Sequence, residues 1–362
     1  MRIDVVVQQL CAPVPGGTGR YTEGLVRGLV ATASTGDVLN AVSTVQAPAL
    51  ADLQLPWQRL AAPPAALARL WERGWPPIAG SARSDAIHAP TLLIPGRWRA
   101  RHLAVTIHDV VPWTHPETLT PRGVAFHRRM AARAARQADL IVTPTEAVAS
   151  QVREMLDPSG SVVAIPPGCA PLPLPPDAPR RRHALGLPTD GYALFVGTAE
   201  PRKGLDVLVS AMVNVPDLSL VHVGPRGWGG VDVAELAARA GIAHRVLPVG
   251  TVDDATLSAV YAGATCVVMP SLAEGFGLPV IEAMAAGIPV ITSDDPALVE
   301  SGGGHALVVA AGEREPLAAA VRQATGPDRL TPAQLERARA HAAGFTWADF
   351  ALKLRRAYSA LS

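Results

Sequence analysis

The sequence has few cysteines, few aromatic residues, almost no lysine and no long apolar run, and these shortages exclude several classes of protein. The three cysteines, Cys11, Cys169 and Cys266, lie far apart and form no CxxC pair, so neither a disulfide framework nor a zinc site is expected. No run reaches the roughly 18 apolar residues needed to cross a bilayer. Asp4 stands where a signal peptide would be apolar, so we expect a cytoplasmic protein.

Charge is nearly balanced, which argues against a nucleic-acid-binding protein. The 362 residues include 32 basic and 31 acidic side chains, a net charge of +1. Hydrophobic residues make up 49% and charged residues 17%, a composition that excludes a disordered chain. Lys203 and Lys353 are the two lysines among these basic residues. In a chain that otherwise uses arginine, Lys203 is a candidate functional residue.

Short apolar runs alternate with helical patterns along the chain, which is typical of parallel α/β architecture. The first half is expected to contain strands at 3–8, 86–88, 103–107, 140–143 and 162–165 and helices at 20–33, 65–71, 122–137 and 146–156. The second half is expected to contain strands at 192–196, 219–223, 245–249, 266–269, 290–292 and 306–309 and helices at 204–213, 233–240, 254–263, 279–286, 316–324, 332–342 and 347–361.

A proline-rich run separates the two halves. Between Pro166 and Pro176 the prolines lack N–H groups and fix φ, so neither a helix nor an inner strand can continue. We therefore predict two doubly wound, Rossmann-like domains over 1–170 and 177–345, with a cleft between them. In such sheets ligands bind outside the carboxyl ends of the strands.

The most informative stretch, 266–290, reads as an apolar strand, a glycine-containing loop and a helix. Glu274 lies in the loop and Glu282 in the first turns of the helix. Gly275 and Gly277 let a ligand approach the backbone, and N–H groups at the helix start suit phosphate. Two carboxylates flanking a diphosphate could accept hydrogen bonds from hydroxyls on either side. Taken singly, Glu274 can also be interpreted as an exposed loop acid and Glu282 as an acid that complements the dipole at a helix start.

A second candidate site is the segment 194–205, in which a strand, a glycine turn at Gly197 and two cations precede a helix. Arg202 and Lys203 at a helix N-terminus oppose the helix dipole, so the arrangement is unfavourable unless an anion is bound. A diphosphate would satisfy both. The alternative is a pair of solvated surface cations.

Two features of the first half complete the set. His108 follows an expected strand and would face the ligand side of the sheet, or else be a structural histidine with Asp109 as a loop cap. The loop after the first strand contains Gly16, Gly17, Thr18 and Gly19. It matches a dinucleotide fingerprint poorly because the third glycine is missing, and a flexible strand-to-helix turn is the alternative.

The run from Glu274 to Gly287, Glu-Gly-Phe-Gly-Leu-Pro-Val-Ile-Glu-Ala-Met-Ala-Ala-Gly, resembles the Glu-x7-Glu motif of retaining glycosyltransferases of family 4. These enzymes have the GT-B fold. The resemblance covers nearly the whole chain, including the glycine-rich first loop, His108-Asp109, 200–204 and 254–263. It implies an α/β, GT-B protein whose last helix, over 346–362, crosses back to the N-terminal, acceptor-side domain.

The resemblance also implies roles for individual residues. Glu274 would contact the donor sugar's hydroxyls, Glu282 would contact the nucleoside ribose, and His108 would lie beside the transferred sugar. Many members carry Gly-Arg where this chain has Gly197-Thr198, and Arg202 would supply that charge. The expected set comprises His108, Lys203, Arg202 and Glu274 for catalysis, Glu282, Gly275, Phe276, Gly277, Leu278 and Gly197 for the donor, and Gly16, Gly17, Thr18 and Gly19 near the diphosphate and acceptor.

The implied reaction is transfer of a hexose with retention from a nucleotide-diphosphate sugar to a hydroxyl of a glycan, lipid-linked or small-molecule acceptor. The Glu-Pro-Arg-Lys segment resembles that of bacterial mannosyltransferases, so GDP-mannose is the first expected donor and a UDP-hexose the second. Neither a metal ion nor a cofactor is expected, because Lys203 and Arg202 supply positive charge at the leaving diphosphate.

Three alternatives stay open at this point. A nucleotide-sugar epimerase or pseudo-glycosyltransferase on the same fold would give no ordinary acceptor-dependent glycoside. A nicotinamide dehydrogenase is disfavoured by the incomplete glycine fingerprint and would bind NAD. A non-catalytic nucleotide- or glycan-binding module would show no turnover.

Arginines also concentrate between Arg97 and Arg136, which suggests peripheral contact with the inner face of a membrane. Arg129, Arg133 and Arg136 are spaced by four and three, and Arg122 extends the same helix face. Trp98, Arg99 and Arg101 precede this helix, and each cation near an anionic surface adds about 1 kcal/mol of attraction. The alternative is a solvated arginine face.

Overall fold

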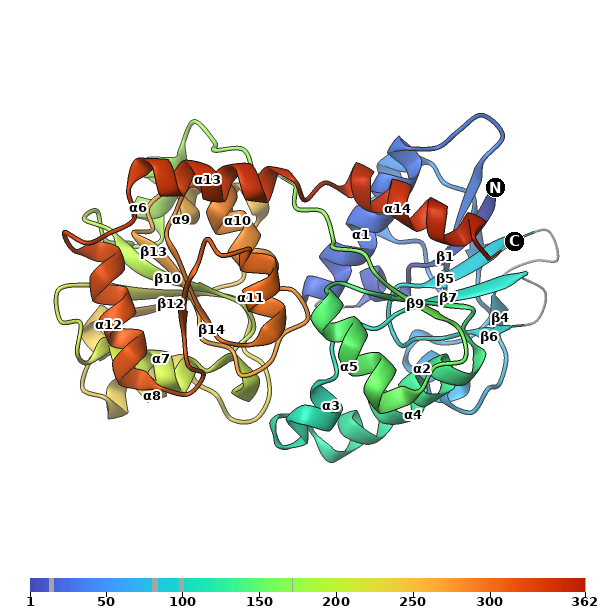
Figure 1. The fold of residues 1–362 in the computed structure, drawn as a ribbon, viewed down its shortest axis with the longest axis horizontal. Coiled ribbons are helices and arrows are strands. Elements are labelled where there is room, and N and C mark those ends of the chain that lie inside the picture. Colours follow the sequence, from blue (N-terminus) through green and yellow to red (C-terminus); the bar gives the residue numbers. More distant parts are fainter. Residues whose placement is uncertain (13–15, 80–83, 98–100, 171, 362) are drawn as a thin grey trace. The chain divides into compact units, whose positions relative to one another are not determined.

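The computed structural model describes residues 1–12, 16–79, 84–97, 101–170 and 172–361, which fold into two compact units (Figure 1). Unit 1 comprises Met1–Trp113, Pro121–Gly168 and Phe345–Ser362, and unit 2 comprises Thr114–Thr120 and Cys169–Gly344. Within these described ranges, no helix is both long enough and apolar enough to cross a bilayer.

Unit 1 is built on a parallel sheet of seven strands in the order β3-β2-β1-β5-β7-β8-β9. Their bounds are β1 Arg2–Val6, β2 Val38–Ser43, β3 Trp57–Arg59, β5 Ala86–Ala89, β7 His102–Thr106, β8 Leu140–Thr143 and β9 Ser161–Ala164. β4 (Ile78–Ala79) and β6 (Gly96–Arg97) form a separate two-stranded parallel sheet.

The helices of unit 1 lie between these strands in the chain and end with a segment from the far C-terminus. They are α1 Gly16–Ala31, α2 Pro64–Glu72, α3 Val111–Thr114, α4 Pro121–Gln137, α5 Glu146–Leu156 and α14 Trp347–Ser359, with 3-10 turns η1 Gln8–Cys11, η2 Pro48–Leu53 and η3 Pro116–Thr118. The strand order reverses direction between β1 and β5, so loops after these strands flank a switch point, where such sheets bind ligands.

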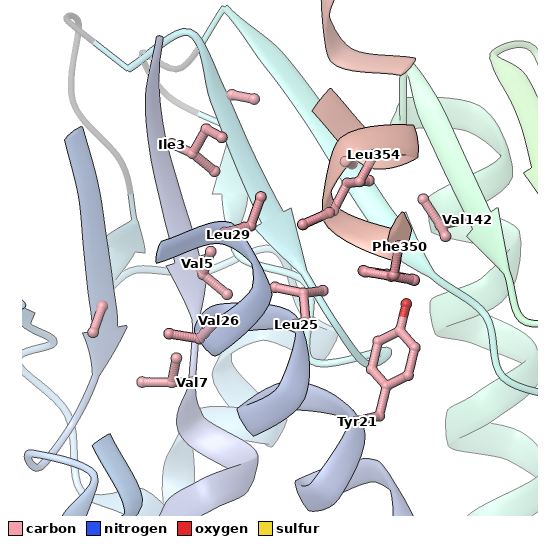
Figure 2. Close-up of a cluster of buried hydrophobic side chains, with 14 of the residues drawn as sticks. Ile3, Val5, Val7, Tyr21, Leu25, Val26, Leu29, Val142, Phe350 and Leu354 are labelled. Carbon is pink, nitrogen blue, oxygen red and sulfur yellow. The ribbon is translucent and has the colours of Figure 1, made fainter. Parts of the chain in front are cut away.

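The core of unit 1 joins the first and last helices of the chain (Figure 2). Leu25 and Leu29 of α1 pack with Phe350 and Leu354 of α14 over β1. The two helices approach closely, since a Cβ atom at Gly24 would lie 2.0 Å from the Trp347 ring. Apolar burial therefore fixes the C-terminal helix on unit 1.

Unit 2 contains a six-stranded parallel sheet in the order β12-β11-β10-β13-β14-β15. Its strands are β10 Tyr192–Val196, β11 Ser219–Val223, β12 Val246–Gly250, β13 Cys266–Met269, β14 Val290–Ser293 and β15 Leu307–Val309. Its helices are α6 Ala178–Ala184, α7 Leu205–Met212, α8 Val233–Arg239, α9 Asp254–Tyr261, α10 Leu278–Ala286, α11 Pro296–Gly302, α12 Arg314–Thr325 and α13 Pro332–Ala343, with 3-10 turns η4 Pro201–Lys203 and η5 Ala243–Arg245.

The predicted doubly wound α/β class is confirmed, whereas several short elements were not predicted. β2 contains Asn40 in its middle, and β3 is a three-residue strand at the sheet edge, so neither has the apolar run typical of an inner strand. Helices α6 and α11, of seven residues each, were also not predicted, although the equally short α8 was.

Candidate active site

The switch point of the unit 2 sheet brings together the loops that carry the predicted donor residues. β10 and β13 are neighbours although they are distant in sequence, and the strand order reverses between them. The loop after β10 carries Arg202 and Lys203, and the loop after β13 carries Glu274. Leu272 N–H donates to the Arg202 carbonyl over 2.7 Å, which ties the two loops together. In doubly wound sheets this is the position where ligands bind.

At the centre of these loops the Glu274 carboxylate lies between two cations. Lys203 Nζ is 2.5 Å from Glu274 Oε1, and Arg202 Nη1 is 3.0 Å from Glu274 Oε2. The side chains are largely buried, with exposures of 12% for Lys203, 18% for Arg202 and 7% for Glu274. Ser271 Oγ donates a further hydrogen bond to Glu274 Oε1 over 2.7 Å.

The ionisation of these groups follows from that geometry. Burial alone would raise the pKa of Glu274, but Lys203, Arg202 and the hydrogen bonds outweigh it and lower the pKa to about 2. Burial, and then the Arg202 charge, lower the pKa of Lys203, and Glu274 opposes both effects. Glu274 is therefore a carboxylate across the physiological pH range.

A second layer of buried groups holds the cluster in place. Glu200, which is 2% exposed, forms an ion pair with Arg202, whose Nε lies 2.8 Å from Glu200 Oε1. Ser293 Oγ donates to the Ser271 carbonyl over 2.5 Å. Asp295 caps α11 by accepting from two of its N–H groups, and it also accepts from the Glu274 backbone. Burial raises the pKa of Asp295 to about 6.

The expectation that Arg202 and Lys203 await an anion needs correction. Protein carboxylates already balance both charges, because Glu274 lies between the two cations and Glu200 contacts Arg202. Both cations also precede the helix in η4 rather than occupying the first turn of α7. A diphosphate would therefore have to compete with Glu274 for Lys203.

Glu282 lies on α10 and is hydrogen-bonded to a tyrosine hydroxyl. It is 7% exposed, and its Oε2 accepts a hydrogen bond from Tyr261 Oη over 2.8 Å. It falls outside the first turn of α10, which contains no acidic residue, so complementing the helix dipole does not explain it.

The other predicted donor residues line the same loops. Gly275 and Phe276 follow Glu274, and Phe276 is buried. Gly277 is the N-cap of α10 with φ +85°, and Leu278 is the first helical residue. Gly197 follows β10, and its carbonyl accepts from His222 Nε2 over 2.8 Å.

The glycine after Lys203 is required by both conformation and packing. Gly204 has φ +66°, and a Cβ atom there would lie 2.4 Å from the Pro270 carbonyl oxygen. Gly204→Ala is expected to lower the free energy of unfolding by about 2–5 kcal/mol, the sum of left-handed strain and overpacking. Urea unfolding would measure it.

Gly186→Ala is the matched control, since Gly186 has φ +67° and no described atom lies within 4 Å of the position that a Cβ would occupy there. It should show the strain alone, about 1–2 kcal/mol. Equal losses of stability in the two variants would contradict the close approach at Pro270.

In unit 1, His108 follows β7 beside the switch point of that sheet. Its Nε2 donates to the Pro90 carbonyl over 2.7 Å, which leaves Nδ1 as the acceptor in the neutral ring. Burial lowers the pKa of His108, while the Pro90 carbonyl and Asp109 oppose this effect. Asp109 Oδ1 accepts from Val111 N over 3.2 Å and so caps the following turn.

The glycine-rich segment differs from the predicted loop. Gly16, Gly17, Thr18 and Gly19 form the first turn of α1, which begins four residues earlier than predicted. Gly16 has φ +63°, and no described atom lies within 4 Å of a Cβ position at either Gly16 or Gly17. The described part of this segment is therefore a helix start with no described atom close to its first two glycines.

Sequence reasoning missed the residues that support the site, namely Ser271, Ser293, Asp295, Tyr261 and Glu200. Glu200 and Ser271 lie next to predicted residues, and their position in the same two loops was the available signal. Nothing in the spacing of Tyr261 and Glu282 indicated their contact, because it depends on how α9 and α10 pack.

Comparison with known proteins identifies the family. The model of the glycosyl transferase 4-like domain matches residues 16–168, and the model of glycosyl transferases group 1 matches residues 190–326. The chain belongs to the group 1 glycosyl transferases. The second match contains Arg202, Lys203, Glu274 and Glu282, so the clustered residues lie within the family's own domain.

Curated relatives of this glycosyltransferase include two kinds of sugar-transferring enzyme. The chain is 29% identical to the O-antigen chain mannosyltransferase B of Escherichia coli over 288 residues, covering 76% of this chain and 74% of that protein. It is 35% identical to the D-inositol 3-phosphate glycosyltransferase of Nocardia farcinica over 240 residues, covering 62% of this chain. The match covers 53% of that second relative's length.

Solved structures confirm the GT-B fold of this glycosyltransferase. Sucrose-phosphate synthase from Thermosynechococcus elongatus has a TM-score of 0.74 at 22% identity, covering 100% of this chain and 99% of that one. The Anabaena protein HepE, in complex with UDP-glucose, has a TM-score of 0.77 at 19% identity, covering 99% and 100%. Family membership also removes the nicotinamide dehydrogenase alternative.

Proposed function

We propose that this glycosyltransferase transfers a hexose, with retention of anomeric configuration, from a nucleotide-diphosphate sugar to an acceptor hydroxyl. The observation that carries the proposal is the buried Lys203–Glu274–Arg202 cluster at the unit 2 switch point. GDP-mannose is the first proposed donor, supported by the mannosyltransferase relative, and a UDP-hexose is the second, supported by the UDP-glucose complex of HepE.

In this proposal Lys203 and Arg202 stabilise the leaving diphosphate. Charge accumulates on the diphosphate as the anomeric bond breaks, and cations fixed in a buried site stabilise that charge more than solvated cations would. Lys203 exchanges its contact with Glu274 for a phosphate oxygen. No metal ion or cofactor is required by this scheme, because the two side chains supply the positive charge.

Glu274 then accepts hydrogen bonds from the hydroxyls of the donor sugar. Its carboxylate has about four acceptor positions, and Lys203, Arg202 and Ser271 use three of them. Once Lys203 turns to the diphosphate, further capacity is available. We propose a front-face transfer in which the leaving phosphate takes the acceptor's proton, so that no carboxylate nucleophile is needed.

We assign His108 to the transferred sugar and Gly16, Gly17, Thr18 and Gly19 to the acceptor and diphosphate. The support is chemical: neutral His108 retains an acceptor nitrogen, and a glycine-rich helix start offers N–H groups with space beside them. The acceptor is proposed to be a glycan, a lipid-linked sugar or a small molecule.

The proposal is tested with a panel of nucleotide sugars. GDP-mannose should raise the thermal midpoint most, since a ligand that binds the native state stabilises it by mass action. NMR of the product should then give an acceptor-dependent glycoside with the donor's anomeric configuration. An epimerised nucleotide sugar without glycoside would instead favour the epimerase alternative, and an inverted product would exclude retention.

Glu282→Ala is expected to weaken binding of the free nucleoside diphosphate by about 1–3 kcal/mol, since a hydrogen bond to a charged group is lost. The maximal rate at saturating donor should change little. Calorimetric titration with GDP and UDP measures the affinity. Tyr261→Phe is the control, because it removes the hydroxyl that holds Glu282 and should give a smaller loss; an unchanged affinity in Glu282→Ala would contradict the ribose assignment.

We limit the proposed membrane contact on α4 to two of the four arginines on one helix face, Arg122 and Arg136. Arg129 pairs with Glu72, and Arg133 donates to the carbonyls of Trp71 and Pro95. Arg122 and Arg136 are exposed on α4. Residues 98–100, including Trp98 and Arg99, lie outside the described residues.

Replacing Arg122 and Arg136 with glutamine should weaken binding to anionic vesicles by about 2 kcal/mol at low salt, about 1 kcal/mol for each charge. Co-sedimentation with phosphatidylglycerol vesicles measures it. The double variant Arg239→Gln, Arg314→Gln removes the same charge from exposed positions of unit 2 and should bind like the unmodified protein. Equal binding by all three proteins would exclude a specific contact.

A further inference from the structure

A chain of buried polar groups connects the C-terminal helix to the neighbourhood of His108. Tyr358 Oη of α14 is hydrogen-bonded to His88 Nδ1 on β5, and His88 Nε2 lies 2.8 Å from Thr106 Oγ1 on β7. Thr106 Oγ1 is in turn 3.3 Å from Tyr21 Oη on α1. None of these side chains is more than 3% exposed. His88 and Tyr358, 270 positions apart, are thus in direct contact, and the four side chains form one continuous path inside unit 1.

The imidazole of His88 makes this path rigid. Both of its nitrogens are hydrogen-bonded, so rotation of the ring would break two bonds in a buried site, where unmade bonds are costly. Burial lowers the pKa of His88 to about 3, so the ring is neutral and has one donor and one acceptor nitrogen. Either tautomer of the neutral ring donates from one nitrogen and accepts at the other, so both bonds of His88 are kept while the ring stays neutral.

At the other end of the path, the ring of Tyr21 packs against His108. The two ring centroids are 4.6 Å apart with an interplanar angle of 89°. His108 is also held at Nε2 by the Pro90 carbonyl, so the ring has one polar and one aromatic restraint. Tyr21 itself packs edge-on against Phe350, 5.6 Å away, and Figure 2 shows it directed toward α14.

Packing alone does not account for the polar members of this path. A phenylalanine at position 21 or 358 would fill the same space without burying a hydroxyl, and a buried hydroxyl is costly unless it is hydrogen-bonded. Apart from Tyr21 and Tyr358, the buried members of the surrounding cluster are leucine, valine, isoleucine and alanine side chains and Phe350, so the cluster is otherwise apolar. Fully bonded buried networks fix a unique arrangement of their members.

We propose that Tyr21 is the positioning residue for His108, and that the Tyr358–His88–Thr106 path fixes Tyr21. The C-terminal helix thereby contributes to the active site of unit 1, although none of its residues contacts the transferred sugar in this scheme. The inference rests on the proposed role of His108. It adds that the orientation of the His108 ring is set by residues from α1, β5, β7 and α14.

A double-mutant cycle between Tyr21 and His108 tests the proposal. Turnover is followed as release of GDP from GDP-mannose, or of UDP from UDP-glucose if the panel selects that donor. We expect Tyr21→Leu to lower the maximal rate at least 10-fold, with little change in the affinity for the free nucleoside diphosphate, because the cations and the carboxylate proposed to bind it, Lys203, Arg202 and Glu282, belong to unit 2. In a His108→Ala background, Tyr21→Leu should lower the residual rate by less than 2-fold, because its effect passes through His108.

Two milder variants keep the test informative if Tyr21→Leu folds poorly. Tyr21→Phe and Tyr358→Phe retain the rings and remove one hydroxyl each. Each should lower the maximal rate about 2- to 5-fold when His108 is present and leave it unchanged when His108 is absent. Leu354→Ala, from the same core cluster but outside the polar path, should lower the thermal midpoint without changing the maximal rate at a temperature where it is folded.

The outcomes separate this inference from the proposed function. If His108→Ala lowers the rate but Tyr21→Leu lowers it by the same factor in both backgrounds, Tyr21 does not act through His108 and the positioning role is wrong. The same conclusion follows if Leu354→Ala reduces the rate as much as the tyrosine variants. If His108→Ala leaves the rate unchanged, the assignment of His108 fails, and the positioning role fails with it.

Discussion

Replacing Lys203 with methionine is expected to reduce the maximal rate of transfer by a factor of roughly 30 to 1,000. That factor corresponds to about 2–4 kcal/mol of lost transition-state stabilisation, typical of removing one fixed group that faces developing charge. The variant should also be less stable by up to about 3 kcal/mol. Glu274 would stay buried with Arg202 and Ser271 but without its closest cation, and an incompletely paired buried charge is costly.

The double variant Lys203→Met, Glu274→Gln distinguishes the two effects. Removing both charges of a buried pair is far less destabilising than removing one, so urea unfolding should show most of the stability restored. Transfer should stay low, because the diphosphate still lacks its cation. Recovery of the rate together with the stability would show that Lys203 serves only to balance Glu274, and the phosphate assignment would then be wrong.

The stability of the protein is expected to fall in acid in a way that depends on Glu274. Its pKa is about 2 in the folded protein against an ordinary value of 4.5. A carboxyl whose folded pKa is lowered contributes stability that is present above pH 4.5 and is lost as the pH falls through about 2. The difference corresponds to a contribution on the order of 3 kcal/mol. Urea unfolding at pH 5 and at pH 2 measures it.

Glu274→Gln is the control for this titration. The unmodified protein should be more stable than the variant at pH 5, and most of this gap should be lost at pH 2, where Glu274 is fully protonated in the unfolded chain and about half protonated in the folded protein. Asp295 acts in the opposite sense, since its raised pKa gives a contribution that is present below pH 3.8 and lost as the pH rises through about 6. It is present in both proteins, so the comparison largely cancels it. A gap independent of pH would contradict an ionised, paired Glu274.

The Glu274–Gly287 motif illustrates how far the sequence leads toward the site. The apolar run of β13, the glycine at the start of α10 and the glycine after it were all predicted from local chemistry. Left-handed φ values at Gly277 and Gly287 explain why glycine stands at both ends of the helix. Because carboxyl ends of parallel strands share one edge, Lys203 and Glu274 could be expected at the same edge of the sheet.

The sequence could not predict that these two residues would bind each other. Lys203 and Glu274 are 71 residues apart, and their contact depends on β10 and β13 being neighbours. Local reasoning therefore treated Lys203 as a cation without a partner. Residues Gly16–Gly19 were likewise predicted to form a loop, because glycines weaken the helix signal in the sequence even where a helix forms.

Local sequence was enough to predict the alternation of strands and helices, the family motif and the residue types available for phosphate and sugar chemistry. These depend on contacts along a few residues of chain, such as turns, caps and apolar periods. The tertiary structure alone decided which charges neutralise each other and which groups surround His108. Tyr21, His88, Thr106 and Tyr358 come from four separate elements, and burial of apolar surface between α1, α14 and the sheet brings them together.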